Sequence, residues 1–106
     1  SEQRKIMTVS SALGSITRTT GGNFFYRCSK SAVNMAMASL ARDVAQRGVI
    51  VGVLSPGIVA TDLTADLDGP KITPLESISG LIPVIDAFTA EQSGQFMRYT
   101  GLQVPW

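Results

Sequence analysis

Apolar runs and helical spacing alternate along this chain and predict its elements. The apolar runs at residues 5–10 and 49–54 are typical of strands, and the second lacks the alternation of a half-exposed strand. Helical spacing covers residues 23–46 and 74–88. Residues 95–99 form a last short strand, so the predicted order is strand, helix, strand, helix, strand. The first three elements imply a right-handed parallel crossover.

Both predicted helices carry end signals. Asn23 is a natural N-cap for the first helix, and Gly48 closes it. Thr73 caps the second helix, which begins with Pro74. Pro83 lies inside that helix and predicts a kink or an early stop.

Apolar and small residues surround the first helix between positions 32 and 41. A helix that is apolar all round is buried on more than one side, so the predicted sheet covers only part of it. Cys28 lies near the start of this helix. We interpret it as a small buried residue, with a reactive thiol as the alternative.

Tyr26 and Lys30 are the most informative pair in the chain. Residues four apart lie on one face of a helix, about one turn apart, so the phenol and the ammonium are expected to be neighbours. A cation beside a phenol favours the phenolate, which makes tyrosine a better proton donor and acceptor near neutral pH. The same spacing occurs on many helix surfaces, so its meaning depends on the surroundings.

Two strand ends flank this pair in the sequence. Ser10 and Ser11 close the first predicted strand, and Pro56 with Gly57 closes the second. We favour Ser11 over Ser10 as a functional serine because Gly14 completes a Ser-x-x-Gly pattern. The order of serine, Tyr-x-x-x-Lys and Pro-Gly-x-x-x-Thr resembles the short-chain dehydrogenase/reductase family.

The resemblance runs from residue 5 to the Tyr-x-Gly-x-x-x-Pro-Trp ending, and it is strongest to the C-factor and sniffer-like branch of the family. It implies an α/β fold, the C-terminal half of a doubly wound parallel-sheet Rossmann-like fold with three α/β/α layers. Residues 1–106 are therefore expected to be the C-terminal part of a single domain. The glycine-rich turn that holds a dinucleotide pyrophosphate is absent from the sequence, and so is the family's catalytic asparagine.

The resemblance also implies an NAD(P)-dependent oxidoreductase that interconverts a small-molecule carbonyl and an alcohol by hydride transfer. By the same resemblance, Tyr26 is expected to exchange a proton with the substrate oxygen, and Ser11 is expected to bind that oxygen. Lys30 supports the phenolate and, with Tyr26, contacts the nicotinamide ribose. Ligands of doubly wound sheets bind beyond the carboxyl ends of the strands, so these motifs are expected to open onto one crevice.

Four residues after the second strand are implied to bind the cofactor, NADP or NAD. Pro56 and Gly57 would let the backbone approach the nicotinamide, and Val59 and Thr61 would lie near its carboxamide. Residues 62–73 form a polar segment that, by the same resemblance, closes over the substrate.

Composition excludes several other classes of function. The chain has no histidine, which rules out Ser-His-Asp and Cys-His sites and histidine-ligated metals within it. Asp62, Asp66 and Asp68 do not fit the register of a calcium loop. A net charge of +1 gives no basic stripe for nucleic acid, and no apolar run is long enough for a membrane span. A single cysteine suits a reducing cytoplasm.

Two expectations concern association. The resemblance implies a homodimer or homotetramer formed through the helix at residues 23–47; a core helix within one subunit is the alternative. Three strands cannot cover both helices on all sides, so the isolated chain is expected to expose large apolar patches, with poor solubility or tight association. A non-enzymatic, C-factor-like signalling or interaction fragment is the second functional hypothesis.

Overall fold

A computed structural model describes residues 3–106 of the chain. Three parallel strands form one sheet in the order β1 (Arg4–Val9), β2 (Val49–Ser55) and β3 (Phe96–Arg98). The central strand β2 is buried on both faces, as its unbroken apolar run predicts. The three predicted strands are confirmed to within one residue at each end.

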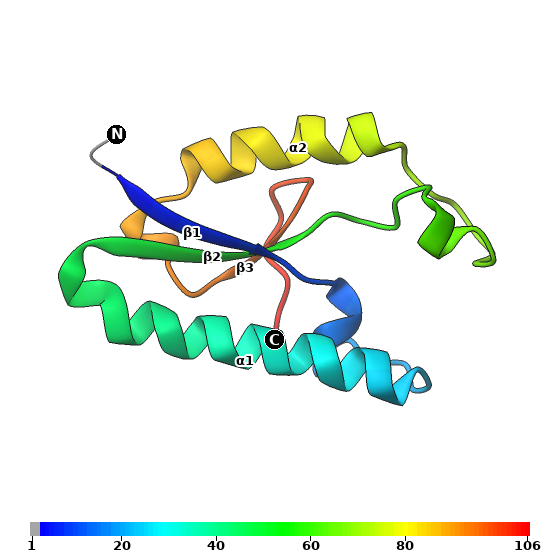
Figure 1. The fold of residues 1–106 in the computed structure, drawn as a ribbon, viewed down its shortest axis with the longest axis horizontal. Coiled ribbons are helices and arrows are strands. Elements are labelled where there is room, and N and C mark those ends of the chain that lie inside the picture. The colour runs from blue at the N-terminus through cyan, green and yellow to red at the C-terminus, as the bar shows by residue number, and fades with distance from the viewer. Residues whose placement is uncertain (1–2) are drawn as a thin grey trace.

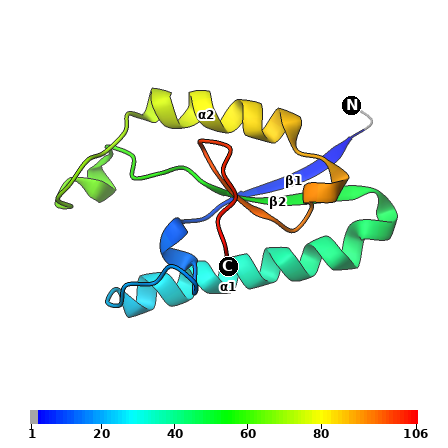
Figure 2. The same cartoon turned by 180° about the vertical axis from the view of Figure 1, so that it is seen from behind.

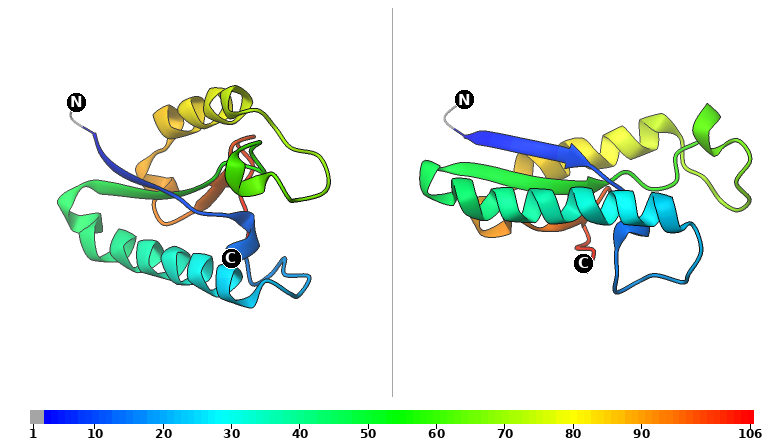
Figure 3. Two further views of the ribbon diagram at one scale, coloured as in Figure 1. Left: turned by 45° about the vertical axis from the view of Figure 1, so that its right-hand side comes forward. Right: turned by 60° about the horizontal axis from the view of Figure 1, so that its bottom comes forward.

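Two helices cover opposite faces of the sheet and complete the three layers. Figure 1 shows α1 (Phe24–Val44) below the sheet and α2 (Pro74–Ala87) above it, and Figure 2 shows the same layers from behind. The two turned views of Figure 3 confirm that each helix lies on its own face. This arrangement is the predicted α/β fold, and each helix begins at the edge of the sheet where the strands end.

The ends of the helices follow the predicted signals in part. Asn23 precedes α1, but it adopts a left-handed conformation (φ 47°) and its side chain makes no capping hydrogen bond. Thr73 caps α2 in a reciprocal capping box with Glu76. The helix continues through Pro83 to Ala87, so the early stop does not occur.

Short 3₁₀ turns fill the connections. These are η1 (Ala12–Gly14) after β1, η2 (Ala45–Arg47) after α1, η3 (Asp62–Thr64) after β2 and η4 (Ala90–Gln92) before β3. Gly48 follows η2 in the left-handed region, as its predicted role of closing the first helix requires.

The core consists of two clusters, one on each face of the sheet. Ile50, Phe88 and Met97 pack with Met7 and Val84 on the side of α2. On the side of α1, Val53, Phe96 and Val104 pack with Met37. Because side chains alternate along a strand, β2 contributes to both clusters and holds the two layers together.

Helix α1 differs from its prediction. Asn34 and Ala41 are its buried residues, whereas Phe25 is 94% exposed. Within the described chain the sheet and η1 pack against one face of the helix and leave the opposite face to solvent. Cover of that second face by a partner subunit stays a prediction. Cys28 is exposed, so its interpretation as a buried residue is wrong.

Exposed apolar side chains are numerous, as expected for a sheet of three strands that cannot cover both helices on all sides. Strand β1 lies at an edge of the sheet, where Ile6 is 43% and Val9 is 55% exposed. Further large apolar residues exposed elsewhere include Ile16, Phe24, Met35, Leu63 and Leu75. Their effect on solubility and association stays a prediction.

Candidate active site

The two serines at the end of β1 lie in different surroundings. Ser10 is 4% exposed; its backbone amide donates to the carbonyl of Leu54 at 2.7 Å, and its hydroxyl has no hydrogen-bond partner among the described residues. Ser11 is half-buried, and its hydroxyl oxygen accepts from the amide of Leu13 at 3.2 Å. The greater access to Ser11 favours it as the residue that meets a ligand.

Tyr26 and Lys30 lie next to each other in the first two turns of α1. The Lys30 ammonium nitrogen is 5.6 Å from the centre of the Tyr26 ring, which is within cation–π range. Tyr26 is 42% exposed, and the Lys30 side chain makes no hydrogen bond or ion pair with any described residue. The phenol therefore faces solvent with a free cation beside it.

Gly14 brings the turn that carries Ser11 against the helix that carries Lys30. A Cβ atom at Gly14 would lie 2.8 Å from the Cβ of Lys30 and 2.9 Å from its carbonyl carbon. The hydroxyl of Ser31 donates to the carbonyl of Gly14 at 2.6 Å. Only a glycine allows so close an approach, and the contact joins the serine turn to the Tyr–Lys pair.

The predicted cofactor residues after β2 lie at the same edge of the sheet but make other contacts. The carbonyl of Pro56 accepts from the hydroxyl of Ser77 at 2.7 Å, which ties it to α2. Gly57 has a φ of 81°, and a Cβ atom there would lie 2.7 Å from the Tyr99 ring. Gly57 thus has the conformation and the close packing that only glycine combines easily.

Val59 and Thr61 are held within the loop itself. Val59 forms an isolated parallel bridge with Ile72, flanked by hydrogen bonds of 2.8 Å on each side. Thr61 caps η3 in a reciprocal pair with Thr64. The structure thus packs the turn that follows Ser11 against the helix that carries Tyr26 and Lys30, on the α1 side. Pro56, Gly57, Val59 and Thr61 lie in a separate loop, which is tied to α2.

Asn34 is a candidate that sequence reasoning did not identify. It is 3% exposed, and neither its amide nitrogen nor its amide oxygen has a hydrogen-bond partner among the described residues. Its nitrogen lies 3.0 Å from where a Cβ of Gly14 would be. A buried polar group without a partner costs about 1–3 kcal/mol. The signal in the sequence is its spacing, since Asn34 is one helical turn beyond Lys30.

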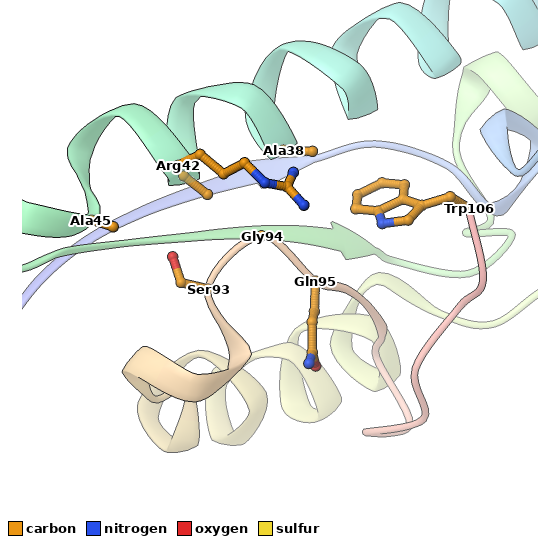
Figure 4. A pocket seen from close by; sticks show the side chains of 8 residues that line it. Ala38, Arg42, Ala45, Ser93, Gly94, Gln95 and Trp106 are labelled. Atoms are coloured by element: carbon orange, nitrogen blue, oxygen red, sulfur yellow. The ribbon is translucent and has the colours of Figure 1, made fainter.

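Two concave pockets lie elsewhere on the molecule. One, of about 350 Å³, lies between the second half of α1, residues 93–95 and Trp106, and Figure 4 shows its side chains. The other, of about 410 Å³, lies between α2 and the turn at residues 99–101. Neither of these two pockets is lined by Ser11, Tyr26 or Lys30.

The residues present fit one part of a dinucleotide. The Lys30 ammonium makes no hydrogen bond or ion pair with a described residue, so its N–H groups are available to ribose hydroxyls. At Gly57 the Tyr99 ring fills the space beside the backbone. Among residues 3–106 no group of three histidine, cysteine or acidic side chains could hold a metal ion. No helix in this described range is long and apolar enough to cross a membrane.

The sequence is similar to proteins of one family. Residues 1–71 match the family model described as short chain dehydrogenase. The chain is 43% identical to 1-hydroxy-2-glutathionyl-2-methyl-3-butene dehydrogenase of Rhodococcus sp. (strain AD45), over 99% of this chain and 48% of that protein. It is 40% identical to C-signal of Myxococcus xanthus, over 97% of this chain and 61% of that protein. The chain spans about half the length of these curated relatives.

The fold of this chain is also similar to the folds of solved carbonyl reductases. The NADPH-bound carbonyl reductase from chicken fatty liver superposes with a TM-score of 0.88 at 31% identity, covering 96% of this chain and 42% of that one. The carbonyl reductase Sniffer of D. melanogaster superposes with a TM-score of 0.86 at 36% identity, covering 96% and 41%. Nearly all of this chain therefore corresponds to under half of each reductase.

Proposed function

Because this chain belongs to the short-chain dehydrogenase/reductase family, we propose that it carries the proton relay of an NAD(P)-dependent oxidoreductase that interconverts a carbonyl and an alcohol. The observation that supports this most is the contact at Gly14. It packs the turn that follows Ser11 against Lys30, and the Lys30 ammonium lies 5.6 Å from the centre of the Tyr26 ring. These contacts support a common site for the three residues.

Each of the three side chains has a distinct role in the proposal. The Tyr26 hydroxyl donates a proton to the substrate oxygen during reduction and accepts it back during oxidation. The Ser11 hydroxyl donates a hydrogen bond to the same oxygen and orients it. The Lys30 ammonium, 5.6 Å from the centre of the phenol ring, stabilises the phenolate that remains after proton donation.

The bound dinucleotide would supply the hydride transfer. In the proposal, Lys30 and Tyr26 bind the ribose next to the nicotinamide, and the loop of Pro56, Gly57, Val59 and Thr61 covers the ring. The chain holds no glycine-rich phosphate-binding turn. We therefore expect turnover from a protein in which further residues bind the pyrophosphate, with NADP or NAD as the cofactor and a small carbonyl compound or alcohol as the substrate.

The substitution Tyr26→Phe tests the relay. It removes one hydroxyl, and we expect turnover to fall by roughly 10²–10⁴-fold because the general acid is lost. The measurement is NADPH oxidation with an aromatic aldehyde by the full-length protein. Tyr99→Phe is the matched control, since the chain has two tyrosines and Tyr99 packs against Gly57 rather than Lys30. Equal activity of Tyr26→Phe and Tyr99→Phe, with both folded, would refute the mechanism.

A second candidate is a non-enzymatic signalling or interaction fragment. The 40% identity to C-signal and the exposed apolar residues of α1 support it. Titration of NADPH into the 106-residue chain and into the full-length protein separates the two functions. Binding and turnover by the full-length protein support the enzyme. If neither preparation changes the fluorescence of NADPH, the interaction fragment is the better account.

A further inference from the structure

The last three residues of the chain are anchored beside β3. The amide of Val104 donates to the carbonyl of Phe96 at 2.7 Å, and the Val104 side chain is 1% exposed in the core. The rings of Trp106 and Phe96 stack with their centroids 5.4 Å apart at an interplanar angle of 22°. Figure 4 shows the Trp106 ring at the end of the C-terminal segment, between this sheet edge and α1. Residues 104–106, here called the C-terminal segment, are thus fixed to the sheet.

The anchored C-terminal segment accepts hydrogen bonds from residues 15–17, which follow η1. The hydroxyl of Ser15 donates to the carbonyl of Pro105 at 2.5 Å, and Ser15 is 1% exposed. The backbone amides of Ile16 and Thr17 both donate to the carbonyl of Trp106. These contacts join positions 90 residues apart in the sequence.

Ser15 is linked to Ser11 through a short, hydrogen-bonded turn. The amide of Gly14 donates to the carbonyl of Ser11 at 2.9 Å, and the amide of Ser15 donates to that of Ala12 at 3.0 Å. Beyond Ser15, residues 16–26 are almost all exposed. Two exposed or partly exposed arginines add weaker bonds: the Arg18 amide donates to the Ser15 hydroxyl at 3.3 Å, and the Arg27 guanidinium donates to the carbonyl of Leu13 at 3.3 Å. The turn is therefore held on one side by α1, through the contact at Gly14 and the bond from Arg27, and on the other side by the buried bonds of the C-terminal segment.

We propose that the C-terminal segment positions Ser11 for catalysis and that Ser15 is the positioning residue that transmits its support. This inference rests on the proposed function, because it assigns the bonds at Ser15 a role in the alignment of Ser11 with Tyr26. A misplacement of about 1 Å in a catalytic group can lower a rate roughly 10²-fold. The C-terminal segment contacts neither Tyr26 nor Lys30 in the described bonds, so its effect on the rate passes through the turn.

Two substitutions test the inference in the full-length protein. Ser15→Ala removes the hydroxyl that bonds Pro105, and Trp106→Ala removes the stack on Phe96. We expect each to lower kcat by roughly 10- to 100-fold with KM changed less than about threefold. Trp106→Phe keeps a ring on Phe96 and is expected to restore most of kcat. Thr89→Ala is the control, because it removes a capping hydroxyl at η4, before β3.

Hydrogen exchange supplies a readout that does not need the reaction. The Ile16 and Thr17 amides are expected to exchange at least about tenfold faster in Ser15→Ala and Trp106→Ala than in the unsubstituted protein and Thr89→Ala, because local opening sets exchange. Unchanged exchange of the Ile16 and Thr17 amides would refute the claim that the C-terminal segment supports the turn. Faster exchange with unchanged kcat would overturn its catalytic role. An unsubstituted protein with no turnover would instead refute the proposed function, while exchange would still decide whether the segment holds the turn.

Discussion

The loop after β1 and the loop after β2 leave the same edge of the sheet, yet they are held in different ways. The first is fixed from two distant parts of the chain, α1 through Gly14 and the C-terminal segment through Ser15. The second is held mainly by its own residues, through the bridge of Val59 and Ile72, with a tie from Pro56 to α2. The serine turn is thus fixed by distant parts of the chain, whereas most bonds of the second loop over residues 60–71 lie within the loop itself.

This difference suits the proposed division of labour. Proton transfer depends on donor and acceptor positions within a few tenths of an ångström, so its residues belong on a supported turn and a helix. A loop that covers a cofactor ring and a substrate must admit and release them.

The largest expected effect comes from Lys30→Met. The substitution keeps most of the length of the side chain and removes its charge, so we expect kcat/KM to fall by roughly 10²–10⁴-fold. Lys71→Met is the matched control in the second loop, and it should change kcat/KM less than about threefold. Steady-state kinetics of both variants make the measurement. Similar losses for both would show that the charge of Lys30 has no special role in the reaction.

Gly14→Ala should have the next largest effect, because it separates the serine turn from α1. The new Cβ would lie 2.8 Å from the Cβ of Lys30, where backbone as well as side chain must move. We expect unfolding to become easier by about 1–3 kcal/mol, as in overpacked cores. We also expect kcat to fall more than this loss of stability explains. Denaturant unfolding and kinetics at a temperature where the variant is fully folded check the two parts.

Gly57→Ala should act on the second loop and mainly on binding. Its φ of 81° is unfavourable for alanine, at a cost of about 1–2 kcal/mol, and the Cβ would meet the Tyr99 ring. We expect a raised KM for the dinucleotide with a smaller change in kcat, the reverse of the pattern for Gly14→Ala. A fall in kcat alone would contradict the proposed role of this loop.

The smallest expected effect is on the pKa of Glu91, a residue that lies outside both loops. The hydrogen bond from the Thr89 side chain, with the amide of Glu91 itself, holds the pKa of the exposed Glu91 carboxyl below its ordinary value. A carboxyl with a lowered pKa in the folded state adds stability above its ordinary pKa, and this contribution is lost as the pH falls through the lowered value. Thr89→Ala should raise the pKa of Glu91, which carboxyl NMR titration measures, and leave kcat unchanged. An unmoved titration would show that the Thr89 hydroxyl is not the cause.

Much of the fold can be predicted from local sequence signals. The unbroken run of β2 and the Thr73-Pro74 start of α2 predict their elements within one residue because strand burial and helix capping depend on neighbouring residues. Pro83 shows the limit of such signals, since α2 continues past it. Whether a helix accommodates a proline depends on its packing as well as on its sequence.

The site is harder to predict from the sequence, because the burial of a side chain depends on which distant segments of the chain pack against it. The apolar positions of α1 predict a helix covered on several sides, but the described chain covers one. The spacing of Asn34 from Lys30 places it on the same face of α1, but its contact with Gly14 and the contact of Ser15 with Pro105 depend on the fold and not on spacing in the sequence. Ser11, Tyr26 and Lys30 were accessible to prediction because their residue types and order carry the chemistry. Their functional roles remain a proposal.

The most direct test of the account is a double-mutant cycle between Ser11→Ala and Tyr26→Phe, read as kcat/KM in the full-length protein. If the two hydroxyls act as one unit on one substrate oxygen, removing both should cost little more than the more damaging single change, within about threefold. If the two losses multiply, the hydroxyls act independently, and the shared surface built by the Gly14 contact is not an active site.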